Sequence, residues 1–101
     1  MTLSDVSNAV SFCMAESVTP EEYESMLIAI RQVKRSEETL SKWQLLNPKD
    51  RIKLTQKASS ARKEFNDIAD KHAFKVEWDS TIPTVSKGNR RVLIPIPNGF
   101  L

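Results

Sequence analysis

The sequence contains few of the residues that usually carry out chemistry. It has 1 cysteine, 1 histidine and 2 glycines in 101 residues. A single cysteine excludes an internal disulfide framework, and a single histidine excludes a two-histidine metal site. Gly88 and Gly99 form no phosphate-cradling loop. No apolar run approaches the roughly 18 to 20 residues of a membrane span, and no basic leader of a secretion signal is present. We therefore expect a cytoplasmic protein that is not an enzyme and needs no metal or cofactor.

The residues that could still act chemically stand in structural patterns. Cys13 lies in an apolar helical pattern without a neighbouring basic residue, which predicts a buried, inert thiol. His72 lies where two helices are expected to meet, which favours a role at a helix end. The adjacent acidic pairs Glu21-Glu22 and Glu37-Glu38 are typical of helix capping and surface charge.

The composition is that of one soluble globular domain, with 28% charged and 40% hydrophobic residues. We expect a single domain over residues 1–101. Its parts are an N-terminal helix in residues 1–18, a helical hairpin in residues 19–73, and a strand with an extended tail in residues 74–101. The fold class is thus mainly α, with a small C-terminal β-hairpin or an extended proline-containing arm.

Two helix starts define the hairpin. Thr19-Pro20 followed by Glu22 predicts a capping box with proline at the first helical position, and Asn47-Pro48 predicts a second start after almost no loop. Apolar residues recur at alternating steps of three and four in both segments, so the helices should return antiparallel. In that register Tyr23 meets His72.

Apolar residues off this seam need another packing partner. They are Ile28, Ala29, Trp43, Leu45 and Ile52. The N-terminal helix supplies an apolar face that could cover them in a three-helix arrangement. The alternative is a hairpin that awaits a partner.

The C-terminal region alternates between apolar and polar residues in Phe74–Trp78, which predicts a strand. Pro83 lacks the N–H that a central strand needs, so the segment around it should be an edge or an extended arm. Lys87–Arg90 predicts a turn, after which residues 92–97 could return beside Phe74–Trp78.

The tail after this strand is too apolar for a linker, and it has two interpretations. It folds back onto the helices and completes the core, or it docks on a partner as an extended segment. The docking candidates are Ile82, Pro83, Ile94, Pro95, Ile96 and Pro97. The three Ile-Pro bonds among them also make a prolyl isomerase a possible partner.

Charge is unevenly distributed along the chain. Residues 1–47 contain four Lys/Arg and seven Asp/Glu, whereas residues 48–101 contain eleven and six. Lysines recur every four residues at the start of the second long helix, either as a solvated face or as a site for an acidic ligand. The basic binding candidates are Lys49, Arg51, Lys53, Lys57, Lys87, Arg90 and Arg91.

Two functions fit these features. The first is a protein-binding modulator, and the second is a nucleic-acid binder that contacts phosphates through the basic residues and stacks bases on Trp43 or Trp78. The mild net charge of +2 and the lack of a recognised nucleic-acid-binding motif favour the first.

The layout also suggests a family. A short, cysteine-poor chain with a helical body and a proline-containing tail resembles the small anti-RecBCD proteins of lambdoid enterobacterial phages. This resemblance implies binding to the host RecBCD helicase-nuclease in the bacterial cytoplasm and modulation of its DNA processing, with a host prolyl isomerase as a possible accessory partner. An anti-CRISPR or another phage inhibitor would have the same layout. The resemblance rests on general organisation, so no family residue is transferred.

Overall fold

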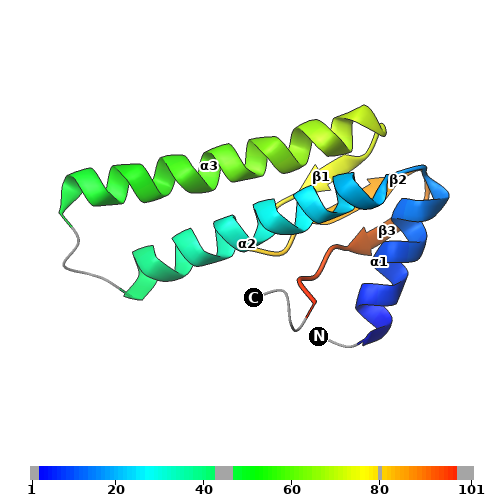
Figure 1. Cartoon of the computed structure of the whole chain (residues 1–101), viewed down its shortest axis with the longest axis horizontal. Coiled ribbons are helices and arrows are strands. Elements are labelled where there is room, and N and C mark those ends of the chain that lie inside the picture. Colours follow the sequence, from blue (N-terminus) through cyan, green and yellow to red (C-terminus); the bar gives the residue numbers. More distant parts are fainter. Residues whose placement is uncertain (1–2, 43–46, 80, 98–101) are drawn as a thin grey trace.

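The computed structural model describes residues 3–42, 47–79 and 81–97. It contains three helices and three strands in the order α1 (Leu3–Ala15), α2 (Pro20–Lys42), α3 (Pro48–Lys71), β1 (Lys75–Glu77), β2 (Thr84–Lys87) and β3 (Arg90–Leu93). The two long helices form an antiparallel hairpin, and the small sheet lies near one end of it (Figure 1). This confirms the predicted fold class. Trp43 and Leu45, which were expected to pack on the second apolar strip, lie outside the described residues.

Side chains cap both long helices at their N-termini. The Thr19 hydroxyl accepts a hydrogen bond from the Glu22 N–H, and the Glu22 carboxylate accepts one from the Thr19 N–H, each at 3.1 Å. The Asn47 side chain accepts a hydrogen bond from the Asp50 N–H at 2.9 Å. Because these bonds satisfy backbone donors that a helix leaves open, the local sequence alone determines where α2 and α3 begin.

Residues with left-handed backbone conformation end α1 and α3. Ser17 has φ 66° and Ala73 has φ 60°. After each of them the next N–H turns back to a carbonyl of the last helical turn, from Val18 to Cys13 at 3.0 Å and from Phe74 to Ala69 at 2.9 Å. Glycine is the usual residue at this position because a Cβ is strained there. Both turns direct a buried side chain, Val18 or Phe74, into the core.

The sheet has the order β1-β2-β3, with both pairs antiparallel. The turn at Lys87–Arg90 is as predicted, and Gly88 adopts φ 62° in it. Two expectations were wrong. The segment after Pro83 is the central strand, and β3 pairs with β2 instead of returning beside β1. Pro83 precedes the strand and needs no N–H there, because it contributes only its carbonyl, which accepts a hydrogen bond from the Ile94 N–H at 3.0 Å.

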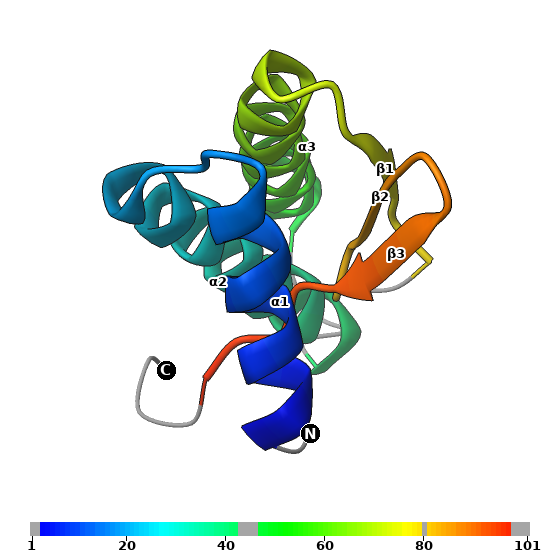
Figure 2. The same cartoon turned by 90° about the vertical axis from the view of Figure 1, so that its right-hand side faces the viewer.

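The N-terminal helix does not run alongside the hairpin as the third member of a bundle. Helix α1 crosses the end of the hairpin and packs against β3 (Figure 2). The expected three-helix arrangement is therefore corrected to a hairpin that the sheet covers on one side and α1 covers at its end. The apolar face of α1 packs at this end through Phe12, whose ring centroid lies 5.2 Å from that of Phe74, the residue just before the sheet.

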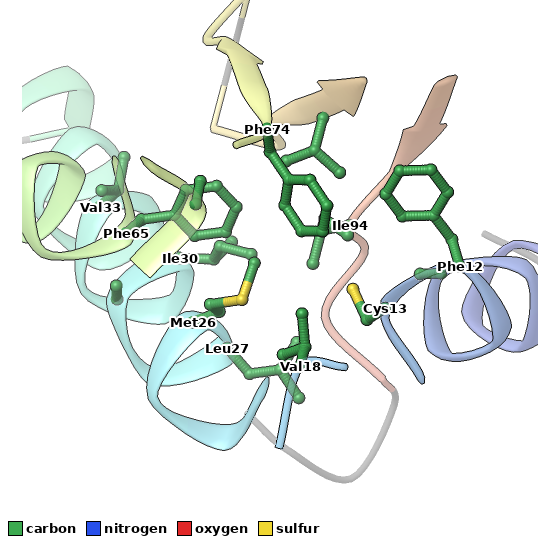
Figure 3. Packing of buried hydrophobic residues seen from close by; sticks show 14 of the residues in the cluster. Phe12, Cys13, Val18, Met26, Leu27, Ile30, Val33, Phe65, Phe74 and Ile94 are labelled. Atoms are coloured by element: carbon green, nitrogen blue, oxygen red, sulfur yellow. The ribbon is translucent and has the colours of Figure 1, made fainter. Parts of the chain in front are cut away.

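The core lies where the hairpin, α1 and the sheet meet (Figure 3). Buried side chains from all three parts make up one cluster: Ala9, Phe12, Cys13, Val18, Met26, Leu27, Ala29, Ile30, Val33, Ala61, Phe65, Ala69, Phe74, Val85 and Ile94. On the long helices the cluster stops at Val33 and Ala61. The remaining turns of α2 and α3 project beyond the sheet and α1 (Figure 1). No helix in the described part of the chain is long and apolar enough to cross a membrane.

Candidate functional site

Cys13 and His72, the residues with the most reactive side chains, both contribute to the fold. The Cys13 side chain is 1% exposed, and burial raises the pKa of its thiol to about 11. A thiol with such a pKa is protonated at neutral pH, and the thiolate is the nucleophile. The predicted burial of Cys13 is confirmed. Among residues 3–42, 47–79 and 81–97, no group of His, Cys, Asp and Glu side chains is arranged to hold a metal ion.

His72 contacts the N-terminal turn of α2. Its Nε2 lies 3.1 Å from Glu22 Oε1, and Lys71 Nζ lies 2.9 Å from Glu22 Oε2. The hydrogen bond from the Thr19 N–H and the hydrogen bond from Lys71 lower the pKa of Glu22 to about 2. His72 thus helps to join the helix ends. The sequence predicted that His72 would meet Tyr23, but it contacts the neighbouring residue Glu22. The Tyr23 side chain lies against α1 instead.

Three of the predicted basic residues are engaged at the sheet end of the molecule. Lys87 Nζ lies 2.8 Å from a carboxylate oxygen of Glu16, the residue that follows α1. Arg91 pairs with Glu77 across the sheet at 2.7 Å. The Arg90 guanidinium lies 5.0 Å from the centre of the Phe12 ring. The Lys87 and Arg90 contacts hold the sheet against the α1 segment, and the Arg91 pair joins β3 to β1 within the sheet. The sheet lies at the opposite end of the hairpin from the start of α3 (Figure 1).

The tail residues lie mainly in the core. Pro83, Ile94 and Pro95 are each less than 2% exposed, and Ile96 packs against the buried cluster. The docking interpretation fails for the first three, because a buried side chain cannot contact a partner while the protein is folded. The structure therefore supports the interpretation in which the tail folds back and completes the core. Ile82, Ile96 and Pro97 are half-buried. A prolyl isomerase would meet the bonds before Pro83 and Pro95 only in the unfolded chain.

Trp78 is also occupied within the fold. Its indole N–H donates a hydrogen bond to the Asn66 side chain at 2.9 Å, and its ring lies edge-on to Phe65 with the ring centroids 5.2 Å apart. The guanidinium of Arg62 lies 5.4 Å from the ring centroid. Trp78 is therefore not a platform for stacking a base, and Trp43, the other candidate, lies outside the described residues.

The strongest concentration of charge lies on the half of the hairpin that leads from the end of the core cluster to the connection between the two helices. We call residues 31–42 of α2 and 47–60 of α3 the hairpin tip. It contains eight Lys/Arg and three Asp/Glu, whereas residues 1–30 contain five Asp/Glu and no Lys/Arg. The cations of the tip are Arg31, Lys34, Arg35, Lys42, Lys49, Arg51, Lys53 and Lys57. Lys49, Lys53 and Lys57 are exposed, as the predicted basic face requires, and Arg51 is half-buried.

A pocket of about 250 Å³ lies between the two helices of the tip. Three of its lining residues are cations, and they come from both helices: Arg31 and Arg35 from α2, and Lys57 from α3. The others are Gln32, Ser36, Thr39 and Leu54. The sequence analysis identified Lys57 but missed the two arginines. Their spacing of four residues was the available signal, because the antiparallel register brings that turn of α2 close to Lys57.

A second pocket of about 250 Å³ lies between α1 and the start of α2. Its lining is almost entirely apolar: Val10, Cys13, Met14, Val18, Pro20 and Tyr23. The Tyr23 hydroxyl is buried and has no hydrogen-bond partner among the described residues. Burial, together with the nearby Cys13, raises the pKa of Tyr23 to about 12, so the hydroxyl keeps its proton.

No known relative helps to interpret these surfaces. In comparisons with protein-family models, with curated proteins and with solved structures, nothing matches the chain. The function therefore has to be argued from the charges, pockets and exposed residues of the chain itself.

Proposed function

We propose that this protein is a non-enzymatic modulator that binds an acidic surface of a larger protein through its hairpin tip. The observation that carries the proposal is the excess of eight cations over three carboxylates on the hairpin tip, most of which projects beyond the sheet and α1. Such a concentration of one sign raises the rate at which an oppositely charged partner associates and orients it on the surface.

The surface between the cations favours a protein over a nucleic acid. Ile52 is 57% exposed among the lysines of α3, and Leu54 is half-buried nearby. Apolar side chains among charged ones are typical of protein interfaces, whereas phosphate contacts need only the charges. The described residues of the tip also include no aromatic side chain on which a base could stack.

The partner that we would test first follows from the resemblance to phage anti-RecBCD proteins. It is the RecBCD helicase-nuclease in the bacterial cytoplasm, and binding would alter its processing of DNA. In this proposal the tip replaces the proline-containing tail as the docking element, since that tail lies largely in the core. In the same proposal a prolyl isomerase is an accessory partner that acts during folding.

Capture from bacterial lysate tests the proposal. Tagged protein is compared with the variant Lys49→Glu/Lys53→Glu, with and without nuclease treatment. We expect a stoichiometric protein partner that survives nuclease and binds the variant at least about tenfold more weakly, because two attractive charges become repulsive. The matched control is Lys63→Glu/Lys75→Glu, which makes the same change in net charge on exposed residues outside the tip and should retain the partner.

Other outcomes decide against the proposal. Equal loss of the partner in the tip variant and the control would show that capture depends on the net charge of the protein and that the cations need not lie on the tip. Recovery of nucleic acid alone, lost at moderate salt concentration, would favour the phosphate-binding alternative.

A further inference from the structure

The pocket in the hairpin tip has a different composition from the exposed lysine face beside it. Arg31, Arg35 and Lys57 bring three positive charges to one hollow, and its lining includes no carboxylate among the residues that the structure describes. Gln32, Ser36 and Thr39 add groups that can form hydrogen bonds. Leu54 is the one aliphatic side chain in the lining. This is the chemistry of a site for an oxygen anion.

Small side chains leave room for the pocket in the seam between the helices. Beyond Val33 and Ala61, the buried positions of the seam hold Ser36, which is 3% exposed, and Ala58, which is 2% exposed. Nearer the core, the seam is filled by larger side chains such as Ile30 and Phe65, which are fully buried. The hollow is thus formed by packed helices, and its cations are held on rigid backbone.

We infer that this pocket receives a carboxylate side chain from the acidic surface of the partner. The inference rests on the proposed function and adds to it a specific anchor. Arginine presents a planar fork of donors that matches a carboxylate, and arginines from one helix together with a lysine from the other surround the anion. A carboxylate that enters a hollow between helices is less screened by water than one that meets Lys49 on the open surface, so the pocket dominates the affinity.

Nuclear magnetic resonance titration of the full-length, ¹⁵N-labelled protein at low ionic strength tests the assignment. The probes are a hexaglutamate peptide, a hexaglutamine peptide, inorganic phosphate and a hexathymidine oligonucleotide. We expect hexaglutamate to give saturable shifts in residues 31–39 and 54–57, and hexaglutamine to give none. Saturation of these residues by phosphate or the oligonucleotide but not by hexaglutamate would overturn the carboxylate assignment, and so would the absence of localised shifts with every probe.

Two matched variants separate the pocket from the surface around it. Arg35→Gln/Lys57→Gln removes two charges from the pocket, and Lys49→Gln/Lys53→Gln removes two from the exposed face. We expect hexaglutamate to bind the first about fivefold more weakly or worse, and the second within about twofold of the original protein. Equal effects would overturn the inference. Retention of the original thermal transition shows that each variant is folded.

The outcome for the pocket can be told apart from the outcome for the proposed function. If Lys49→Glu/Lys53→Glu abolishes partner capture while Arg35→Gln/Lys57→Gln leaves it unchanged, the tip binds the partner but the pocket is not the anchor. If neither pair of substitutions affects capture, the proposed function itself fails.

Discussion

Replacing Ile94 by alanine tests whether the C-terminal segment belongs to the core. Ile94 follows β3, is fully buried, and lies in the cluster with Phe12 and Phe74 (Figure 3). The substitution removes three carbons, worth about 2.4 kcal/mol at roughly 0.8 kcal/mol per buried CH₂, and the cavity left behind adds to this cost. We therefore expect the free energy of unfolding to fall by about 3 kcal/mol.

Urea denaturation followed by far-ultraviolet circular dichroism measures this loss, and a thermal scan provides a second measurement. For a domain of this size, about 3 kcal/mol corresponds to a decrease in Tm of roughly 12 to 24 °C. Such a loss is a large part of the roughly 5 to 15 kcal/mol that stabilises a typical domain.

The neighbouring residue gives a matched control. Leu93→Ala removes the same number of carbons, but the Leu93 side chain is 48% exposed, so we expect a loss below about 1 kcal/mol. If Ile94→Ala costs no more than Leu93→Ala, Ile94 is not part of the core. Loss of partner capture in that case, with stability unchanged, would restore the docking interpretation of the tail.

Two further predictions concern the ends of the helices. Ala73→Gly should stabilise the protein by about 0.5 to 1 kcal/mol, because it relieves the left-handed conformation at φ 60°. The control Ser60→Gly, in the exposed middle of α3, should destabilise it by a similar amount. A loss of stability in Ala73→Gly would contradict the helix-end geometry. Glu22→Gln keeps an oxygen that can accept a hydrogen bond from Thr19 but loses the charge, so its stability should fall below that of the original protein at neutral pH. Since the folded state lowers the pKa of Glu22 from 4.5 to about 2, this difference should be present above pH 4.5 and disappear as the pH falls to about 2. A difference that persists at pH 2 in a series of urea denaturations would contradict this assignment.

The elements with local signals could be predicted from the sequence. The capping residues of α2 and α3 act on backbone groups three positions away, and Gly88 supplies the turn conformation within its own hairpin. In each case the physical cause lies within a few neighbouring residues. The antiparallel hairpin could also be predicted, because the connection between Lys42 and Pro48 is too short for the second helix to run in the same direction as the first.

The arrangement of the sheet and of the tail could not be predicted in the same way. Alternation in Phe74–Trp78 shows that one face of the strand is apolar, but it does not say which strand lies beside it. Whether Ile94 is buried depends on Phe12 and Phe74, which are distant in the sequence and contribute no local pattern. For the same reason, the local spacing of lysines revealed the exposed face of α3, but the pocket required the meeting of Arg35 with Lys57 from another helix.

The contact between α1 and the sheet has a consequence for the order of folding. The hairpin and the sheet each form from segments that are neighbours in the chain, whereas the Glu16–Lys87 pair closes a separation of 71 residues. Contacts between distant parts of a chain form slowly, because the entropy of loop closure opposes them before any burial compensates. The docking of α1 on the sheet should therefore be the last and slowest step of folding, and the core is completed only then.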